Sequence, residues 1–172
     1  MPDLGTVTGA KKDIPFSYRA SEVVNAGLAN LIGKRFSAVH MTWGAINEMT
    51  TLTGYRRLAA AVNHPVLTHI LKGIMREEAT HSFFYSSLAR LQLLHSRYAR
   101  HLTRTIIDHF WSPVGQGAKR EEDTNYVIRM LFSGKEGVDT IDTFVNKRLA
   151  LLPGFEDCKK VTARIAQVVM PQ

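Results

Sequence analysis

The sequence has few of the features that mark secreted and membrane proteins. It contains one cysteine, Cys158, so no disulfide can form within the chain, and we expect a reduced, cytoplasmic environment. No stretch approaches about 18 uninterrupted apolar residues, so we expect no membrane-spanning helix. Residues 1–12 lack the apolar core of a signal peptide.

The sequence also lacks sustained strand alternation, internal repeats and low-complexity tracts. Its 172 residues are about the length of one domain, and 45% hydrophobic with 22% charged residues is an ordinary globular composition. The net charge of +7 favours acidic partners, which include nucleic acid, anionic lipid and acidic carrier proteins. No nucleic-acid-binding motif is present, so we expect no nucleic-acid partner.

What remains is a strong helical pattern. Residues 1–16 combine glycine, proline and adjacent lysines and predict a flexible arm, and residues 17–172 predict a single all-α domain. Asn63-His64-Pro65 breaks the longest helical stretch, because proline removes a donor and disfavours helix at the preceding residue. The expected helices span residues 17–32, 36–62, 66–94, 96–111, 120–133, 136–151 and 156–169.

One motif in the second long helix has the spacing of metal ligands. Glu78 and His81 form an E-x-x-H sequence, and residues three apart on a helix share one face. A metal ion can therefore take a carboxylate oxygen and an imidazole nitrogen from the same helix. The motif is short, and alone it is a weak signal.

The position of Glu48 strengthens this interpretation. Glu48 lies 15 residues before Asn63, and Glu78 lies 15 residues after it. At about 1.5 Å per residue, both are about 22 Å from the turn, which places them at one level of an antiparallel hairpin. A long helix with an inward glutamate beside a long helix with E-x-x-H is the half-unit of di-iron carboxylate bundles.

Apolar residues accompany these polar groups at helical spacing. On the two helices these are Met41, Ala45, Leu52 and Tyr55, and Ile70, Ile74 and Tyr85. We also predict that Phe83 and Phe84 belong to the core. Gly44 and Gly54 lie inside the first long helix, where glycine permits close approach of a neighbouring helix or ligand.

A simpler interpretation stays open at this point. Glu48 and Glu78 can face solvent, with His81 a hydrogen-bonded core residue. If the two carboxylates are buried, however, they need a partner, because an unpaired buried charge is costly. A metal ion would offset that cost.

At these residues the chain resembles a known family. It is similar to the second half of ferritin-like di-iron proteins of the acyl-carrier-protein desaturase type, including bacterial ferritin-like domain proteins. The resemblance covers residues 36–155 and is most specific in the hairpin. The matching runs are Glu48-Met49-Thr50-Thr51, Glu77-Glu78-Ala79-Thr80-His81 and His109-Phe110-Trp111-Ser112-Pro113-Val114-Gly115.

The resemblance implies a role for each matching residue. Glu48, Glu78 and His81 would be ligands of iron, with manganese also possible, and one of the glutamates would bridge two ions. Thr51 would supply the hydroxyl near the oxygen-binding face and is the candidate catalytic residue. Glu77 would orient a ligand from outside the coordination sphere.

The chain departs from the family in one respect. A complete site takes a second glutamate and a second E-x-x-H, and this sequence has no other E-x-x-H. Glu121, Glu122, Asp123 and Glu136 follow later, without a matching histidine pattern. Three explanations stay open: a homodimer that shares one site, a split or truncated protein that needs its other half, and a vestigial site in a structural protein.

The sequence therefore predicts a ferritin-like helical bundle with extra C-terminal helices. The expected function is that of an oxygen-activating di-iron oxidoreductase with a half-site per chain. Iron binding or storage, and non-catalytic interaction, are the alternatives. Arg97, Arg100 and Arg104 share a helix face, which is interpreted as a solvated surface or as a docking site for an acidic acyl carrier protein.

Overall fold

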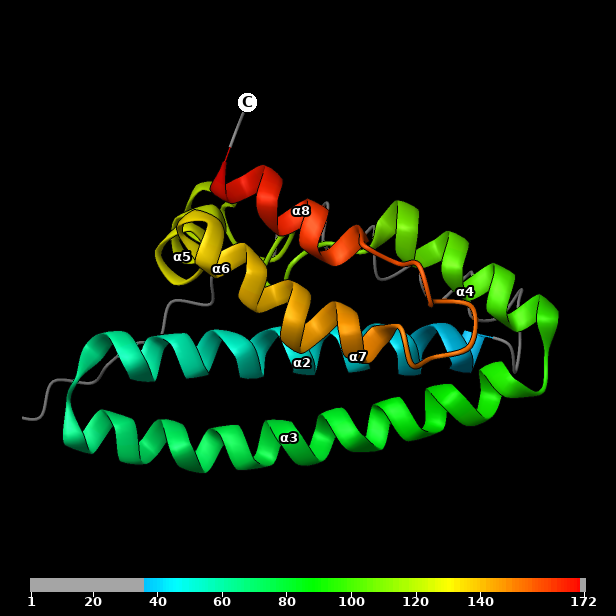
Figure 1. Ribbon diagram of the computed structural model, residues 1–172, viewed down its shortest axis with the longest axis horizontal. Helices are drawn as coiled ribbons and strands as arrows, with labels where there is room; N and C mark the ends of the chain where they lie inside the picture. Colours follow the sequence, from blue (N-terminus) through cyan, green and yellow to red (C-terminus); the bar gives the residue numbers. More distant parts are fainter. Residues whose placement is uncertain (1–35, 171–172) are drawn as a thin grey trace, which may run out of the picture.

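The computed structural model describes residues 36–170, and these residues fold into helices and loops (Figure 1). The predicted arm at residues 1–16 and the predicted helix at residues 17–32 lie outside this range. The elements are α2 (Phe36–Val62), α3 (Pro65–Leu94), α4 (Arg97–Phe110), α5 (Glu121–Phe132), α6 (Gly134–Ile141), a π-helical turn η2 (Asp142–Asn146), α7 (Lys147–Leu149) and α8 (Lys160–Val169). The prediction of an all-α fold with a long hairpin and extra C-terminal helices is confirmed.

The sharp turn between α2 and α3 comes from its three residues. Asn63 has a φ of 44°, in the left-handed region that asparagine tolerates better than most residues. His64 is extended, and its ring accepts a hydrogen bond from the Leu67 backbone N–H at 3.3 Å, which caps α3. Pro65 occupies the first position of α3, where its missing N–H costs nothing. The two helices therefore run antiparallel along their whole length (Figure 1).

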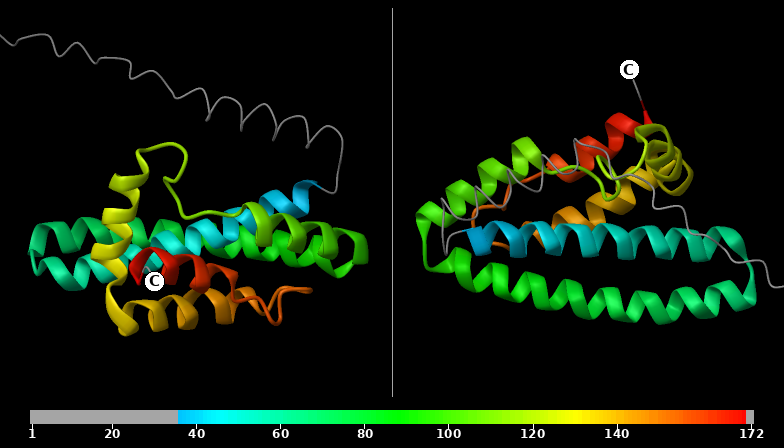
Figure 2. Two further views of the ribbon diagram at one scale, coloured as in Figure 1. Left: turned by 90° about the horizontal axis from the view of Figure 1, so that it is seen from above. Right: turned by 180° about the vertical axis from the view of Figure 1, so that it is seen from behind.

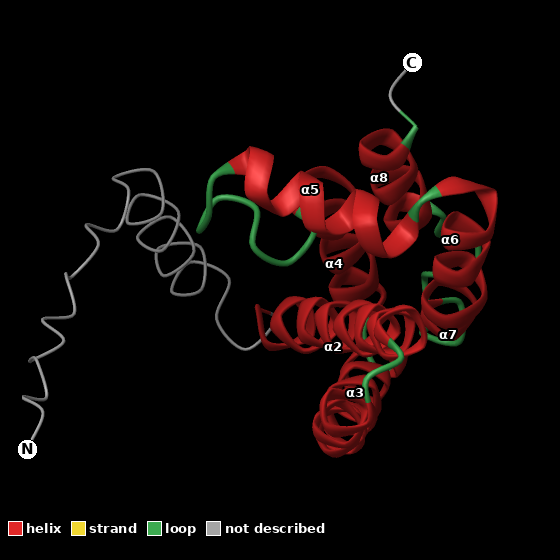
Figure 3. Cartoon of the chain, turned by 90° about the vertical axis from the view of Figure 1, so that its left-hand side faces the viewer, coloured by secondary structure: helices red, strands yellow, loops and turns green. Residues whose placement is uncertain are grey.

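The two hairpin helices differ in how much of their surface is covered. Helix α2 is central, with α3 on one side and α4, α5 and η2 against other parts of its surface. Its buried residues are Ala38, Val39, Thr42, Ala45, Ile46, Met49, Thr50, Leu52, Thr53 and Gly54. Those of α3 are Leu71, Ser82, Ala89 and Leu93. Helix α3 is thus the outer layer of the described fold (Figure 3).

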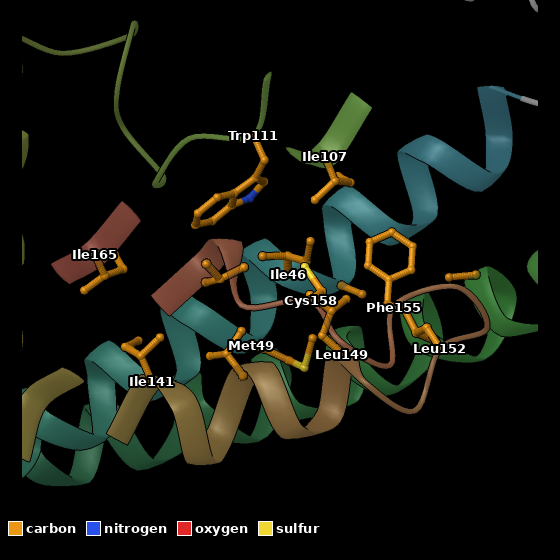
Figure 4. Packing of buried hydrophobic residues seen from close by; sticks show 14 of the residues in the cluster. Ile46, Met49, Ile107, Trp111, Ile141, Leu149, Leu152, Phe155, Cys158 and Ile165 are labelled. Carbon is orange, nitrogen blue, oxygen red and sulfur yellow. The ribbon is translucent and has the colours of Figure 1, made fainter. Parts of the chain in front are cut away.

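The C-terminal helices form the main core with α2. Helix α5 crosses the hairpin direction, and α6 to α7 run along α2 (Figure 2). Figure 4 shows the resulting apolar cluster, in which Ile107, Trp111, Ile141, Leu149, Phe155 and Ile165 are fully buried. No helix in residues 36–170 is long and apolar enough to cross a membrane.

Two helices differ in detail from the prediction. The helix expected at 136–151 is present from Gly134 to Leu149 as α6, η2 and α7, but it contains the π-helical turn η2, where the Asn146 amide donates hydrogen bonds to Asp142 and to Thr162 of α8. The helix expected at 156–169 begins only at Lys160, because Leu152, Phe155 and Cys158 are buried in the preceding loop. At residues 156–159, burial of the loop in the core overrides the local helical pattern.

A third difference from the prediction lies on the surface of α3. Phe83 and Phe84 were expected in the core, yet their exposed fractions are 75% and 55%. Helix α2 covers only the side of α3 that carries buried residues such as Ala89 and Leu93, so both rings remain largely in solvent. Tyr85, the next residue, is partly buried and packs on the core.

Candidate metal centre

The structure brings together the three residues that the hairpin spacing singled out. Glu48 projects from α2 toward Glu78 and His81 of α3, and one potential ligand atom from each lies within 4.8 Å of the other two. The antiparallel register causes this, since both glutamates are equally far from the turn. The predicted convergence is confirmed, and metal binding by the three residues stays a prediction. Among residues 36–170, this is the one such group of histidine, cysteine or acidic side chains.

The two carboxylates of the group sit close to each other. Partial burial, together with a hydrogen bond and charge repulsion from Glu78, raises the pKa of Glu48 to about 7. Two carboxylates that share a site cannot both ionise without cost, so one of them holds a proton near neutral pH. A cation between the two carboxylates would remove this repulsion, and its presence stays a prediction.

His81 is the third member of the group and lies on its solvent-exposed side. Its Nδ1 lies 3.9 Å from Glu48 Oε2, which is within ion-pair distance but longer than a hydrogen bond. The His81 side chain is 58% exposed, whereas that of Glu48 is 22% exposed. The alternative of a buried core histidine is therefore wrong, and the group opens to solvent along one flank of α3.

The donor set suits a divalent cation. Two carboxylates and one imidazole are ligands that iron and manganese both accept, and a cation would replace the shared proton between Glu48 and Glu78. Three protein ligands leave further coordination positions free. The arrangement can therefore bind a metal and still admit water, oxygen or a ligand from another chain.

Thr51 occupies a different environment from the ligands. It lies one helical turn after Glu48, is half-buried, and lines an apolar cavity of about 250 Å³. The other α2 residues of the cavity are Thr50, Gly54, Tyr55 and Leu58, and the loop and α5 contribute Pro113, Val114, Val127, Ile128, Met130, Leu131 and Phe132, with Ile165 from α8. The predicted hydroxyl thus stands beside a space for an apolar group.

Close packing aligns α2 with α3 next to the site. A Cβ atom on Gly44 would lie 2.7 Å from the ring of Tyr85, so only glycine leaves room for this ring. Tyr85 follows His81 by one turn and packs on the core. The predicted use of Gly44 for close helix approach is confirmed. Gly54 instead faces Leu131 of α5.

A contact that sequence reasoning missed anchors α2 beside Glu48. The fully buried Trp111 donates a hydrogen bond from Nε1 to the Asn47 side chain at 3.1 Å. Asn47 directly precedes Glu48, so this bond ties the end of α4 to the ligand-bearing part of α2. In the sequence, the only indication of a role for Asn47 is its position next to Glu48. Its hydrogen-bond partner, Trp111, is 64 residues away and is identified only by the tertiary structure.

The remaining candidates lie apart from the group. Glu77 is exposed on α3 and, within the described part of the chain, takes part in no ion pair. Arg104 was expected on a solvated face, but its guanidinium binds Asp108 and Asp157, each at 2.7 Å. The acidic residues of α5, Glu121, Glu122 and Asp123, are exposed at its first turn.

Comparison with known proteins adds no assignment. No family model, no curated protein and no solved structure matches this chain. The function has to be argued from the geometry of the Glu48, Glu78 and His81 group and from its surroundings.

Proposed function

We propose that this chain is a ferritin-like, non-haem di-iron protein that activates oxygen, with half of the metal site on each chain. The observation that carries the proposal is the convergence of two carboxylates and one imidazole from two long antiparallel helices. Ferritin-like di-iron bundles hold their metals with glutamates and E-x-x-H motifs on facing helices.

Each residue of the group has a separate task in this proposal. Glu48 and Glu78 would hold the ions through carboxylate oxygens, which must lose the proton between them for metal to bind. His81 would contribute a ring nitrogen, and its Nδ1 is the one that faces Glu48. Iron would supply the redox chemistry toward oxygen, and manganese fits the same donors.

The surroundings of Thr51 favour an oxidoreductase over an iron store. An enzyme acting on an apolar substrate needs an apolar space near the metal, and the cavity beside Thr51 is lined almost entirely by apolar side chains. The resemblance to acyl-carrier-protein desaturases suggests an acyl chain as that substrate. Because one fold hosts many chemistries, the substrate rests on the cavity together with this analogy.

Iron binding without an organic substrate is the second candidate function. The exposure of His81 favours it, since a site open to water exchanges iron readily. The two functions differ in a measurable way. An oxidoreductase couples oxygen consumption to a change in an apolar substrate, whereas an iron store consumes oxygen in proportion to added ferrous iron alone.

The missing ligands must come from outside the described hairpin. A second copy of the chain, or a separate protein that carries the other helix pair, would supply them. An acidic acyl carrier protein would dock on the basic face of α4, where Arg97 is exposed while Arg104 is bound to Asp108 and Asp157.

The decisive test is metal analysis of purified protein from iron-supplemented cells. We expect His81→Ala and Glu78→Ala each to lose most of the bound iron. His64→Ala is the matched control, because His64 is an exposed histidine at the far end of the same hairpin. Equal iron content in all four proteins would refute the proposed site.

A further inference from the structure

One face of α3 carries an apolar row that the described elements cover only in part: Ile70, Phe84 and Leu91 are exposed, and the other apolar members are half-buried. The row, called here the α3 seam, alternates steps of three and four residues, the spacing of helices that pack side by side along their length. Three of its members are about half exposed, Ile70 at 51%, Phe84 at 55% and Leu91 at 55%. The seam consists of Leu67, Ile70, Ile74, Glu77, His81, Phe84, Leu88 and Leu91.

The α3 seam is distinct from the face that packs on α2. At 100° per residue, the seam is centred about a quarter turn or more from the buried positions Leu71, Ala89 and Leu93. Figure 3, which looks along the hairpin, shows α3 at the edge of the fold with α2 against one side. The seam passes through His81, so whatever covers it also reaches the candidate metal centre.

The order of residues in the seam is symmetric about Ala79. Each seam position before Ala79 has a counterpart at the same distance after it. An antiparallel copy of α3 would place these pairs opposite each other: Leu67 with Leu91, Ile70 with Leu88, Ile74 with Phe84, and Glu77 with His81. Apolar residues then meet apolar residues, and the two polar residues meet at the centre.

Charge distinguishes this arrangement from a parallel one. In an antiparallel pair each Glu77 faces a histidine, whereas in a parallel pair Glu77 faces Glu77 and His81 faces His81. A carboxylate that faces a ring N–H can accept a hydrogen bond from it, whereas two facing Glu77 carboxylates repel each other and disfavour association. Self-complementarity of this kind points to a second copy of the chain as the occupant, because a two-fold interface uses the same surface on both partners.

We propose that two chains associate through their α3 seams, antiparallel, about a two-fold axis at the level of Ala79. The Glu77 carboxylate of each chain then accepts a hydrogen bond from Nε2 of the other chain's His81, while Nδ1 of that ring faces Glu48. Glu77 is thus a positioning residue that acts in trans. This role rests on the proposed function, whereas the pairing of the seams stands without it.

Bonding to Nε2 has a chemical consequence for the metal centre. A ligating histidine that donates its other N–H to a carboxylate has a fixed ring orientation and tautomer and is a stronger base. Within one chain, the group of potential ligand atoms is formed by Glu48, Glu78 and His81 and does not include Glu77. The dimer gives this exposed acid a partner and brings the two half-sites to neighbouring positions.

The register is tested by disulfide formation in the full chain. Ile74→Cys combined with Phe84→Cys should give a covalent dimer under mild oxidation, because facing seam residues come within the distance of about 4.4–6.8 Å between Cα atoms that a disulfide needs. The control combines Ile70→Cys with Phe84→Cys, which is out of register by one helical turn. The unmodified chain, whose cysteine Cys158 is buried, gives the background level of covalent dimer.

Mass in solution is measured by light scattering, with and without ferrous iron. We expect a dimer, with a dissociation constant at least about tenfold higher for Glu77→Arg than for Glu121→Arg, an exposed acid outside the seam. A monomer under all conditions, or a dimer that cross-links equally in the control pair, overturns the proposal. If the protein is a monomer, the α3 seam would instead be covered by residues 17–32 or by a different protein.

The positioning role is tested in the disulfide-locked dimer, where association no longer varies. Glu77→Gln should lower iron affinity by about 10-fold, the smaller effect typical of residues that orient a metal ligand. An unchanged affinity overturns the role of Glu77 in trans. A locked dimer in the expected register that binds no iron at all would refute the proposed function and leave the seam pairing intact.

Discussion

Glu48 shows how a single side chain depends on its surroundings. Partial burial and the neighbouring Glu78 raise its pKa from the ordinary value of 4.5 to about 7. The folded protein therefore binds a proton here more tightly than the unfolded chain does. This contribution to stability is complete below about pH 4.5 and is lost as the pH rises through about 7.

The first prediction follows from this loss of stability with rising pH. In metal-free protein, Glu48→Gln should remove the loss of stability between about pH 4.5 and 7, because the amide keeps the hydrogen bond to Glu78 without titrating. Urea unfolding at several pH values measures the effect. Glu121→Gln, at an exposed acid far from the pair, should leave the pH profile of the wild-type protein unchanged. Parallel profiles for wild type and Glu48→Gln would contradict the assignment.

Metal binding should show the opposite pH dependence at the same residue. The cation competes with the proton shared by Glu48 and Glu78, so iron affinity should rise as the pH increases through about 7. A titration with ferrous iron under anaerobic conditions at several pH values measures this. An affinity independent of pH would mean that the iron binds elsewhere.

Among the helices, α4 is joined to the loop before α8 by one arginine. Arg104 donates to Asp108 and Asp157 at 2.7 Å and to the Gly154 carbonyl at 3.1 Å, and its guanidinium lies 5.6 Å from the centre of the Phe155 ring. These contacts join α4 to the loop before α8. The loop packs Phe155 and Cys158 into the core, so Arg104 links α4 to a buried part of the loop that leads to α8.

Removal of this link should weaken the fold without affecting the metal. We expect Arg104→Ala to lower the free energy of unfolding by about 2 kcal/mol, since several hydrogen bonds to a charged group are lost together. Arg97→Ala, on the exposed side of the same helix, should change it by less than about 0.5 kcal/mol. Chemical denaturation and iron content measure the two outcomes. Equal destabilisation by both variants would show that the Arg104 contacts contribute little.

The hairpin helices were predictable because their signals are local. Proline and asparagine at the turn, and a long helical pattern on each side, predicted helices at 36–62 and 66–94, and the structure has Phe36–Val62 and Pro65–Leu94. The π-helical turn η2 inside the helix expected at 136–151 was not predictable in this way. At this turn Asn146 contacts Thr162, which lies on a different element.

At the scale of the whole molecule, the proposed metal couples to stability. A ligand that binds only the folded state stabilises it, by about 2.7 kcal/mol at a free concentration 100 times the dissociation constant. For a domain of this size that corresponds to a rise of about 5–10 °C in Tm. We expect this rise on addition of ferrous iron without oxygen, followed by thermal denaturation.

The control for this experiment is the ligand variant. Glu78→Ala should show no rise in Tm with iron, since one of the two carboxylates is lost. Identical Tm values of the wild-type protein with and without iron would indicate a vestigial site. The protein would then belong to the non-catalytic class.

The sequence by itself determined the helices of the hairpin, its turn and the common level of Glu48 and Glu78. These follow from local backbone preferences and from the constant rise of a helix. The E-x-x-H spacing likewise placed His81 on the same face as Glu78. The candidate ligands therefore follow from residue order and helix geometry alone.

Only the tertiary structure decided what surrounds those residues. The raised pKa of Glu48, the apolar cavity beside Thr51 and the partly exposed α3 seam depend on which helices pack against which faces. Helical periodicity identifies apolar faces but does not say which of them find a neighbour in the same chain. Phe83 and Phe84 were assigned to the core for that reason, and they lie exposed because α2 covers only one side of α3.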